Sequence, residues 1–181
     1  MRALRALSLG AVMLAGCASD APPAMAATAQ SPAWKTVGTW MVHVDRSLGG
    51  CFVMKGFDGG IGIRVGLWPL GRTWYLMLEN PDWARDVAAD YPLEISFDGY
   101  RSWDGIASPM PSQGPGIVAM RIDDEWLADF AVGHVMTVRH QGRVVAQLSL
   151  SGTYAAVNEM LDCQEAINES RVVHKPVGQE A

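Results

Sequence analysis

The chain has 181 residues, a length typical of one domain, and 49% of them are hydrophobic, which is enough to build a packed interior. This content excludes an intrinsically disordered chain, and 19 Gly and 10 Pro without a short repeat exclude a collagen-like or low-complexity protein. Lys and Arg number 14 against 19 Asp and Glu, so the net charge is −5 and nucleic-acid binding, which needs a basic surface, is not expected.

The N-terminus has the features of a bacterial secretion signal. Two arginines precede an apolar run over residues 6–16, which is shorter than the roughly 20 residues of a membrane-spanning helix. The run ends in the sequence Leu-Ala-Gly-Cys at residues 14–17, which resembles the lipobox of bacterial lipoproteins. We therefore expect residues 1–16 to be removed as a signal peptide and Cys17 to carry the lipid that anchors the protein in the membrane.

An ordinary signal peptide is the alternative at this end of the chain. The sequence Ala-Met-Ala at residues 24–26 offers a conventional cleavage site, and cleavage there would leave a soluble periplasmic protein.

Removal of residues 1–16 takes away two arginines, so the net charge changes from −5 to −7. Residues 17–33 are rich in Ala, Pro and Ser without apolar periodicity, which predicts a flexible tether.

The number of cysteines fits an extracytoplasmic location. With Cys17 assigned to lipid, Cys51 and Cys163 are left as an even pair in an oxidising compartment, so we expect a disulfide between them. The bridge would close a loop of about 110 residues, tie a late helix to an early strand, and contribute about 4 to 5 kcal/mol to stability. The alternative is two separate buried thiols.

From residue 38 onward, short apolar runs alternate with turn residues, which is the pattern of β-structure. The two residues Gln141-Gly142 favour a tight hairpin, because Gly tolerates a positive φ. The expected strands cover residues 39–44, 51–57, 61–68, 73–78, 91–97, 101–107, 117–122, 134–140 and 143–150.

Two helices are expected among these strands. Asp123 or Asp124 can cap a short helix near residues 124–132, which Gly133 would end. A C-terminal helix is expected near residues 153–167. Its apolar positions fall on one stripe, which consists of Ala156, Met160, Cys163 and Ile167.

These elements together predict a mainly β (α+β) fold in one globular domain over residues 34–167. Its form would be an antiparallel β-sandwich or half-open barrel of about eight or nine strands. Residues 168–181 lack an apolar stripe and are expected to be disordered.

No motif for catalysis, metal binding or a cofactor is found. The histidines, including His43, His134 and His140, are not in a metal-binding spacing, and no nucleophile-elbow motif occurs. The acidic run at residues 123–125 lies where a helix begins, so capping explains it. We therefore expect a protein that is not an enzyme and has no cofactor; a hydrolase whose site uses dispersed histidines is the less favoured reading.

Seven tryptophans are the less ordinary feature of the composition. Trp40 and Trp74 have the neighbours of core strands, whereas Trp68, Trp83 and Trp103 lie beside Pro, Asp or Gly in loop-like surroundings. Exposed aromatic rings supply contact area at a low entropic cost, so these three residues form the candidate binding surface for a protein or glycan. The alternative is that they close the open edges of a small core.

Three segments carry a resemblance to known proteins, namely Gly38-Thr39-Trp40, Asn80-Pro81-Asp82-Trp83 and the segment from Leu148 to Gln164. Through them the chain resembles a group of small secreted proteobacterial lipoproteins of unassigned activity. The same outline of a β-rich body and a closing small-residue helix is similar to proteins of the invasion-associated locus B type. This resemblance implies an extracytoplasmic β-rich protein and brings no catalytic residues.

The function expected from these observations is that of a non-catalytic lipoprotein of the bacterial cell envelope, facing the periplasm. Its partners would be the membrane, through the lipid on Cys17, and an envelope protein or glycan. Inhibition of a lysozyme or another secreted hydrolase is the alternative, because residues 151–154, Ser-Gly-Thr-Tyr, look loosely like a segment of lysozyme inhibitors.

Overall fold

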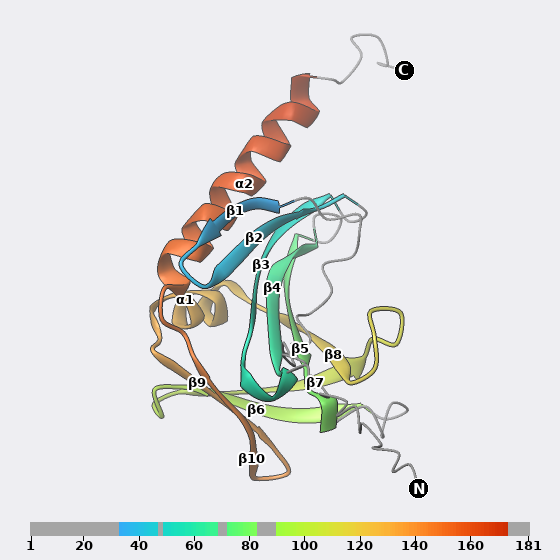
Figure 1. Ribbon diagram of the computed structural model, residues 1–181, viewed down its shortest axis with the longest axis vertical. Coiled ribbons are helices and arrows are strands. Elements are labelled where there is room, and N and C mark those ends of the chain that lie inside the picture. The colour runs from blue at the N-terminus through green and yellow to red at the C-terminus, as the bar shows by residue number, and fades with distance from the viewer. Residues whose placement is uncertain (1–32, 47–48, 69–71, 83–89, 174–181) are drawn as a thin grey trace, which may run out of the picture.

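The structure, a computed structural model, describes residues 33–46, 49–68, 72–82 and 90–173. It contains one ten-stranded sheet and two α-helices (Figure 1). The strands are β1 (Ala33–Val37), β2 (Trp40–Asp45), β3 (Gly50–Gly56), β4 (Gly62–Trp68), β5 (Thr73–Glu79), β6 (Tyr91–Phe97), β7 (Ser102–Pro109), β8 (Ile117–Ile122), β9 (Val135–His140) and β10 (Arg143–Ser149). The helices are α1 (Asp124–Val132) and α2 (Thr153–Val173), and a 3-10 turn spans Asp58–Gly60.

The sheet is antiparallel throughout and follows the order β1-β2-β3-β4-β5-β8-β7-β6-β9-β10. Its two halves meet at β7 and β8, which pair through only Ser108 with Ala119 and Pro109 with Val118. This narrow junction lets the sheet bend, so the half with β6 and β9 crosses below the half with β2 to β5 (Figure 1). The predicted mainly β fold, an open antiparallel sandwich or barrel with a C-terminal helix, is confirmed.

The main core lies where the two halves of the sheet and the helices face one another. In β6 the alternating residues Leu93, Ile95 and Phe97 point into it, as their spacing predicts. Helix α1 adds Trp126 and Phe130, whose rings stack at 5.3 Å between centroids. Burial of each such side chain stabilises the fold by about 1.5 to 3 kcal/mol relative to exposure.

Helix α1 begins and ends at the predicted residues. The carboxylate of Asp123 accepts a hydrogen bond from the backbone N–H of Trp126 at 2.8 Å, which satisfies one of the free donors of the first turn. At the other end, the N–H of Gly133 donates to the carbonyl of Asp129 at 2.9 Å. The hairpin between β9 and β10 also forms as expected, with positive φ at Gln141 and Gly142.

Helix α2 packs on the sheet through the predicted stripe. Ala156, Met160 and Cys163 are fully buried, and Ile167 packs partly against the same core. The helix contacts β1, β2, β3 and α1 and projects beyond them at its C-terminal end (Figure 1). It therefore covers the edge of the sheet that carries the first strand.

Helix α2 continues beyond the predicted end at Ile167 to Val173. Extension of a formed helix costs little, because each added residue gains a hydrogen bond without a new nucleation step. Near its end, the hydroxyl of Ser170 also donates to the carbonyl of Ala166 at 2.8 Å. The helix thus includes residues 168–173, which lack an apolar stripe, and residues 174–181 lie outside the described residues.

Strand β1 is one strand more than the sequence predicts. Four of its five residues are exposed, so the alternation of buried and exposed positions that marks other strands is missing. It forms because its backbone pairs with β2, with Val37 opposite Trp40 and Thr36 opposite Met41. The expected tether over residues 17–33 therefore gives way to structure at Ala33, and residues 1–32 lie outside the described residues.

Candidate functional site

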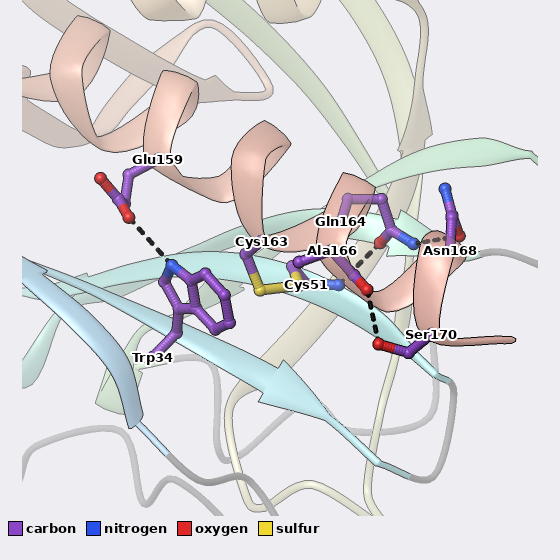
Figure 2. The surroundings of a disulfide bond; sticks show 8 residues. All are labelled: Trp34, Cys51, Glu159, Cys163, Gln164, Ala166, Asn168 and Ser170. Atoms are coloured by element: carbon purple, nitrogen blue, oxygen red, sulfur yellow. Dashed lines mark hydrogen bonds between the residues drawn. A yellow bond between two sulfur atoms is a disulfide. The ribbon is translucent and has the colours of Figure 1, made fainter. Parts of the chain in front are cut away.

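The predicted disulfide between Cys51 and Cys163 is confirmed. It joins β3 to α2 with a distance of 6.1 Å between the Cα atoms, and both residues are at most 1% exposed (Figure 2). Beside it, the side-chain carbonyl of Gln164 accepts a hydrogen bond from the backbone N–H of Cys51 at 2.9 Å. Disulfides persist in oxidising compartments, so this bond indicates an extracytoplasmic protein.

Strand β1 is attached to α2 next to this disulfide. The indole N–H of Trp34 donates to one carboxylate oxygen of Glu159 at 2.9 Å (Figure 2). The ammonium of Lys35 donates to the other oxygen at 2.6 Å. These hydrogen bonds lower the pKa of the Glu159 carboxyl, with that from Lys35 the largest cause. One carboxylate thus holds the first described strand against the helix.

Trp68 lies at the end of β4, on the face of the sheet opposite the main core. It belongs to a row of planar groups that crosses four strands, which we call the Arg64 stack. The stack consists of His43, Phe52, Arg64, Tyr75 and Trp68. The distances between neighbouring centres are 5.3 Å from His43 to Phe52, 3.6 Å from the Phe52 ring to the Arg64 guanidinium, 5.5 Å from that group to the Tyr75 ring, and 5.0 Å from Tyr75 to Trp68.

Hydrogen bonds hold the buried guanidinium at the centre of the Arg64 stack. Arg64 donates to the carboxylate of Asp45 at 2.6 Å and to the hydroxyl of Tyr75 at 2.7 Å. Burial raises the pKa of Tyr75 to about 12. Gly66 keeps this space open, because a Cβ atom there would lie 2.6 Å from Phe52 and 2.7 Å from the Tyr75 hydroxyl. Sequence reasoning missed this cluster, and its signal is a lone Arg between two glycines in an apolar strand.

Trp103 lies in β7 on the opposite side of the sheet from Trp68, because it packs against the main core. Its indole N–H donates to the carboxylate of Asp129 in α1 at 3.1 Å. The guanidinium of Arg101 lies over its ring at 4.1 Å. The structure therefore does not bring Trp68 and Trp103 together, and Trp83 lies outside the described residues.

The residues that hold Trp103 also line a hollow of about 230 Å³, which we call the Tyr100 pocket. Tyr100 is 89% exposed and Val132 is 64% exposed, so two large apolar side chains face solvent at its rim. The other lining residues are Phe97, Asp98, Arg101, Asp129 and Gly133. Aromatic, carboxylate and guanidinium groups thus meet here on a rigid frame of strand and helix.

Asp98 fixes the turn that presents Tyr100. Its carboxylate accepts hydrogen bonds from the backbone N–H groups of His134 at 3.0 Å and Val135 at 2.9 Å. These bonds, the first of them the largest cause, lower the pKa of the Asp98 carboxyl. The turn between β6 and β7 is therefore tied to the start of β9.

A second hollow, of about 450 Å³, lies over β6, β7 and the hairpin of β9 and β10. We call it the β6–β9 groove. Its charged and apolar lining side chains come from three neighbouring strands, and sequence reasoning did not predict them because they are not close in the chain. Among them are Pro92, Glu94, Asp104, Ile106, Arg139 and Gln141.

The three histidines considered for dispersed catalysis lie apart from one another. His43 is buried and stacked on Phe52. His134 is exposed, with its ring 3.4 Å from the Asp98 carboxylate, and His140 lies 2.9 Å from the carbonyl oxygen of Pro92. Each therefore has a different environment, in a different strand or turn.

Two features are absent from the described residues. In residues 33–46, 49–68, 72–82 and 90–173, no group of three or more His, Cys, Asp or Glu side chains is arranged to hold a metal ion. Within the same ranges, no helix combines the length and the apolar character needed to span a bilayer. Residues 151–154, whose sequence looks loosely like a segment of lysozyme inhibitors, form the turn into α2 and its first residues, and Tyr154 is 62% exposed.

Comparison with known proteins identifies a shared fold. No protein-family model matches the chain, and no curated protein matches it significantly. Among solved structures, invasion associated protein B from Bartonella henselae is similar, with a TM-score of 0.56 and 16% sequence identity over 75% of this chain and 99% of that chain. The distant similarity to proteins of this type is thus confirmed at the level of the fold.

Proposed function

We propose that this protein, which has the fold of invasion associated protein B, is a non-catalytic binding protein of the bacterial cell envelope. The buried disulfide supports an oxidising compartment. The observation that carries the binding role is the Tyr100 pocket, where Tyr100 and Val132 stay exposed beside fixed charged groups. Its partner is an envelope protein or glycan.

The chemistry of the Tyr100 pocket suits the binding of a protein or glycan. A tyrosine ring supplies apolar contact area and loses few rotamers on binding, and its hydroxyl keeps a hydrogen-bonding end. Asp98 and Asp129 are held in place by backbone and indole N–H groups, so their carboxylates are oriented before a ligand arrives. Contributions of Trp68, Trp83 and Trp103 to binding stay predictions.

Recovery of partners from envelope extracts tests this proposal. We expect Tyr100→Ala to lose partners that the wild-type protein captures, whereas Tyr154→Ala, which removes an exposed tyrosine from α2, should retain them. Both positions are exposed, so neither change should alter folding. Equal recovery with both variants would remove the Tyr100 pocket from the binding surface. Inhibition of a lysozyme is checked separately, by an activity assay with excess protein.

The anchor on Cys17 is part of the same proposal. Several acyl chains would hold the protein on membranes in high salt, because apolar insertion does not depend on charge. The acidic body, with a net charge of −7 after removal of residues 1–16, would be repelled by anionic headgroups. We expect Cys17→Ser to release the protein from membranes or to block its processing. A wild-type protein whose mass shows no lipid would contradict the anchor.

A further inference from the structure

We propose that the β6–β9 groove is a second binding site, which takes short peptides with a cationic side chain, an aliphatic neighbour and a free terminal carboxylate. The groove is separate from the Tyr100 pocket and the inference does not depend on it. Its volume of about 450 Å³ lies within the range of about 300 to 1,000 Å³ that is usual for ligand sites. A few residues of an extended peptide would fit.

The cation is specified by two carboxylates that face each other across a strand pair. Glu94 in β6 and Asp104 in β7 are register partners, so two like charges lie opposite each other, an arrangement that is unfavourable without a counter-charge. Glu94 accepts a hydrogen bond from the hydroxyl of Ser102 at 2.9 Å. Within the described ranges, Asp104 has no ion-pair partner. A ligand ammonium between the two carboxylates would relieve this repulsion.

The terminal carboxylate is specified by Arg139. This residue is the register partner of Glu94 on the other side of β6, so the row Asp104, Glu94, Arg139 runs straight across three strands. In the described part of the chain, no carboxylate lies within ion-pairing distance of its guanidinium. A guanidinium binds a carboxylate through two parallel hydrogen bonds, so Arg139 is suited to a peptide terminus.

The aliphatic neighbour is specified by the next row of the groove. Pro92 in β6 and Ile106 in β7 are register partners two residues from the charged row, and Ile106 is 60% exposed. An aliphatic side chain adjacent to the cation would cover this pair. β6 pairs with β7 along both rows and with β9 at the charged row, so the backbone fixes the positions of these residues before the ligand binds.

The test uses the full-length protein and a tripeptide, N-acetylated Ala-Leu-Lys, in three forms. One form has a free C-terminus, the second carries acetyllysine and the third ends in an amide. We expect calorimetry to show that loss of either charge weakens binding by about tenfold. Equal affinities for the three forms, or no binding at about 1 mM peptide, would overturn the proposal.

Substitutions in the groove test which side chain binds each charge of the peptide. Asp104→Asn should abolish the preference for lysine over acetyllysine, and Arg139→Gln should abolish the preference for the free carboxylate over the amide. Asp162→Asn in α2 and Arg121→Gln in β8 change the same residue types at exposed positions elsewhere and should keep both preferences. If Asp104→Asn and Arg139→Gln also keep both preferences, the groove does not bind the peptide. Failure here would leave the recovery experiment with Tyr100→Ala unaffected.

Discussion

Removal of the disulfide by the double change Cys51→Ala and Cys163→Ala should destabilise the protein by about 5 kcal/mol. The two cysteines are 112 residues apart, and the loop entropy released in the unfolded chain grows with the logarithm of that number. A domain is commonly stable by about 5 to 15 kcal/mol, so the variant should be close to unfolding at ambient temperature. Both cysteines are changed together, so that neither is left as an unpaired half of the disulfide.

Urea unfolding followed by tryptophan fluorescence measures this loss as a difference in the free energy of unfolding. Gln164→Met is the matched control, because it removes the other link between α2 and Cys51, the hydrogen bond of 2.9 Å, and should cost about 1 kcal/mol. Chemical reduction of the wild-type protein should reproduce the double variant. A loss below about 1 kcal/mol in the double variant would refute the loop-entropy argument.

Three further measurements test the packing beside Gly66 and the ionisation of Tyr75 and Asp98. Gly66→Ala should destabilise the fold by about 1 to 3 kcal/mol in urea unfolding, because the new Cβ atom meets Phe52. In the control Gly56→Ala, the new Cβ atom has no neighbour within 4 Å, so this change should be nearly neutral. Equal losses of stability in the two variants would contradict this reasoning. Tyr75 should ionise near pH 12 in a titration of tyrosinate absorbance. Because an unfolded chain would lose this proton near pH 10, the contribution of the neutral Tyr75 to folding stability is complete below pH 10 and is lost between pH 10 and pH 12. Four tyrosines that ionise together near pH 10 would exclude this. The lowered pKa of Asp98 means that its carboxylate stabilises the fold above the usual pKa of 3.8, and that this stabilisation is lost as the pH falls through the lower value. A carboxyl that titrates by NMR at or above pH 3.8 would contradict the backbone hydrogen bonds.

Local patterns in the sequence were sufficient for most of the individual elements. Alternation of apolar residues predicts which face of β6 is buried, because side chains of a strand point to opposite sides in turn. The capping carboxylate of Asp123 and the hairpin at Gln141-Gly142 follow from residues that are close in the chain. The disulfide follows from parity, since two cysteines remain after Cys17 is assigned to lipid.

Apart from the hairpin at Gln141-Gly142, strand partners were decided by the tertiary structure. β1 carries no alternation and exists because β2 offers it a backbone to pair with. The separation of Trp68 from Trp103 likewise depends on which face of the bent sheet each strand presents. A period of two residues assigns a side chain to a face, but it does not say which strand lies beside it.

The same reason explains why the Arg64 stack and the β6–β9 groove escaped prediction. The Arg64 stack requires four strands in register, and the charged row of the β6–β9 groove requires β6 to lie between β7 and β9. Apart from β1 and the C-terminal end of α2, the sequence by itself determined the type of the elements, their buried faces and their approximate ends, because these depend on neighbours within a few residues. The tertiary structure decided which side chains meet across strands, because those contacts join residues up to several tens of positions apart, and the pairing of whole strands selects them.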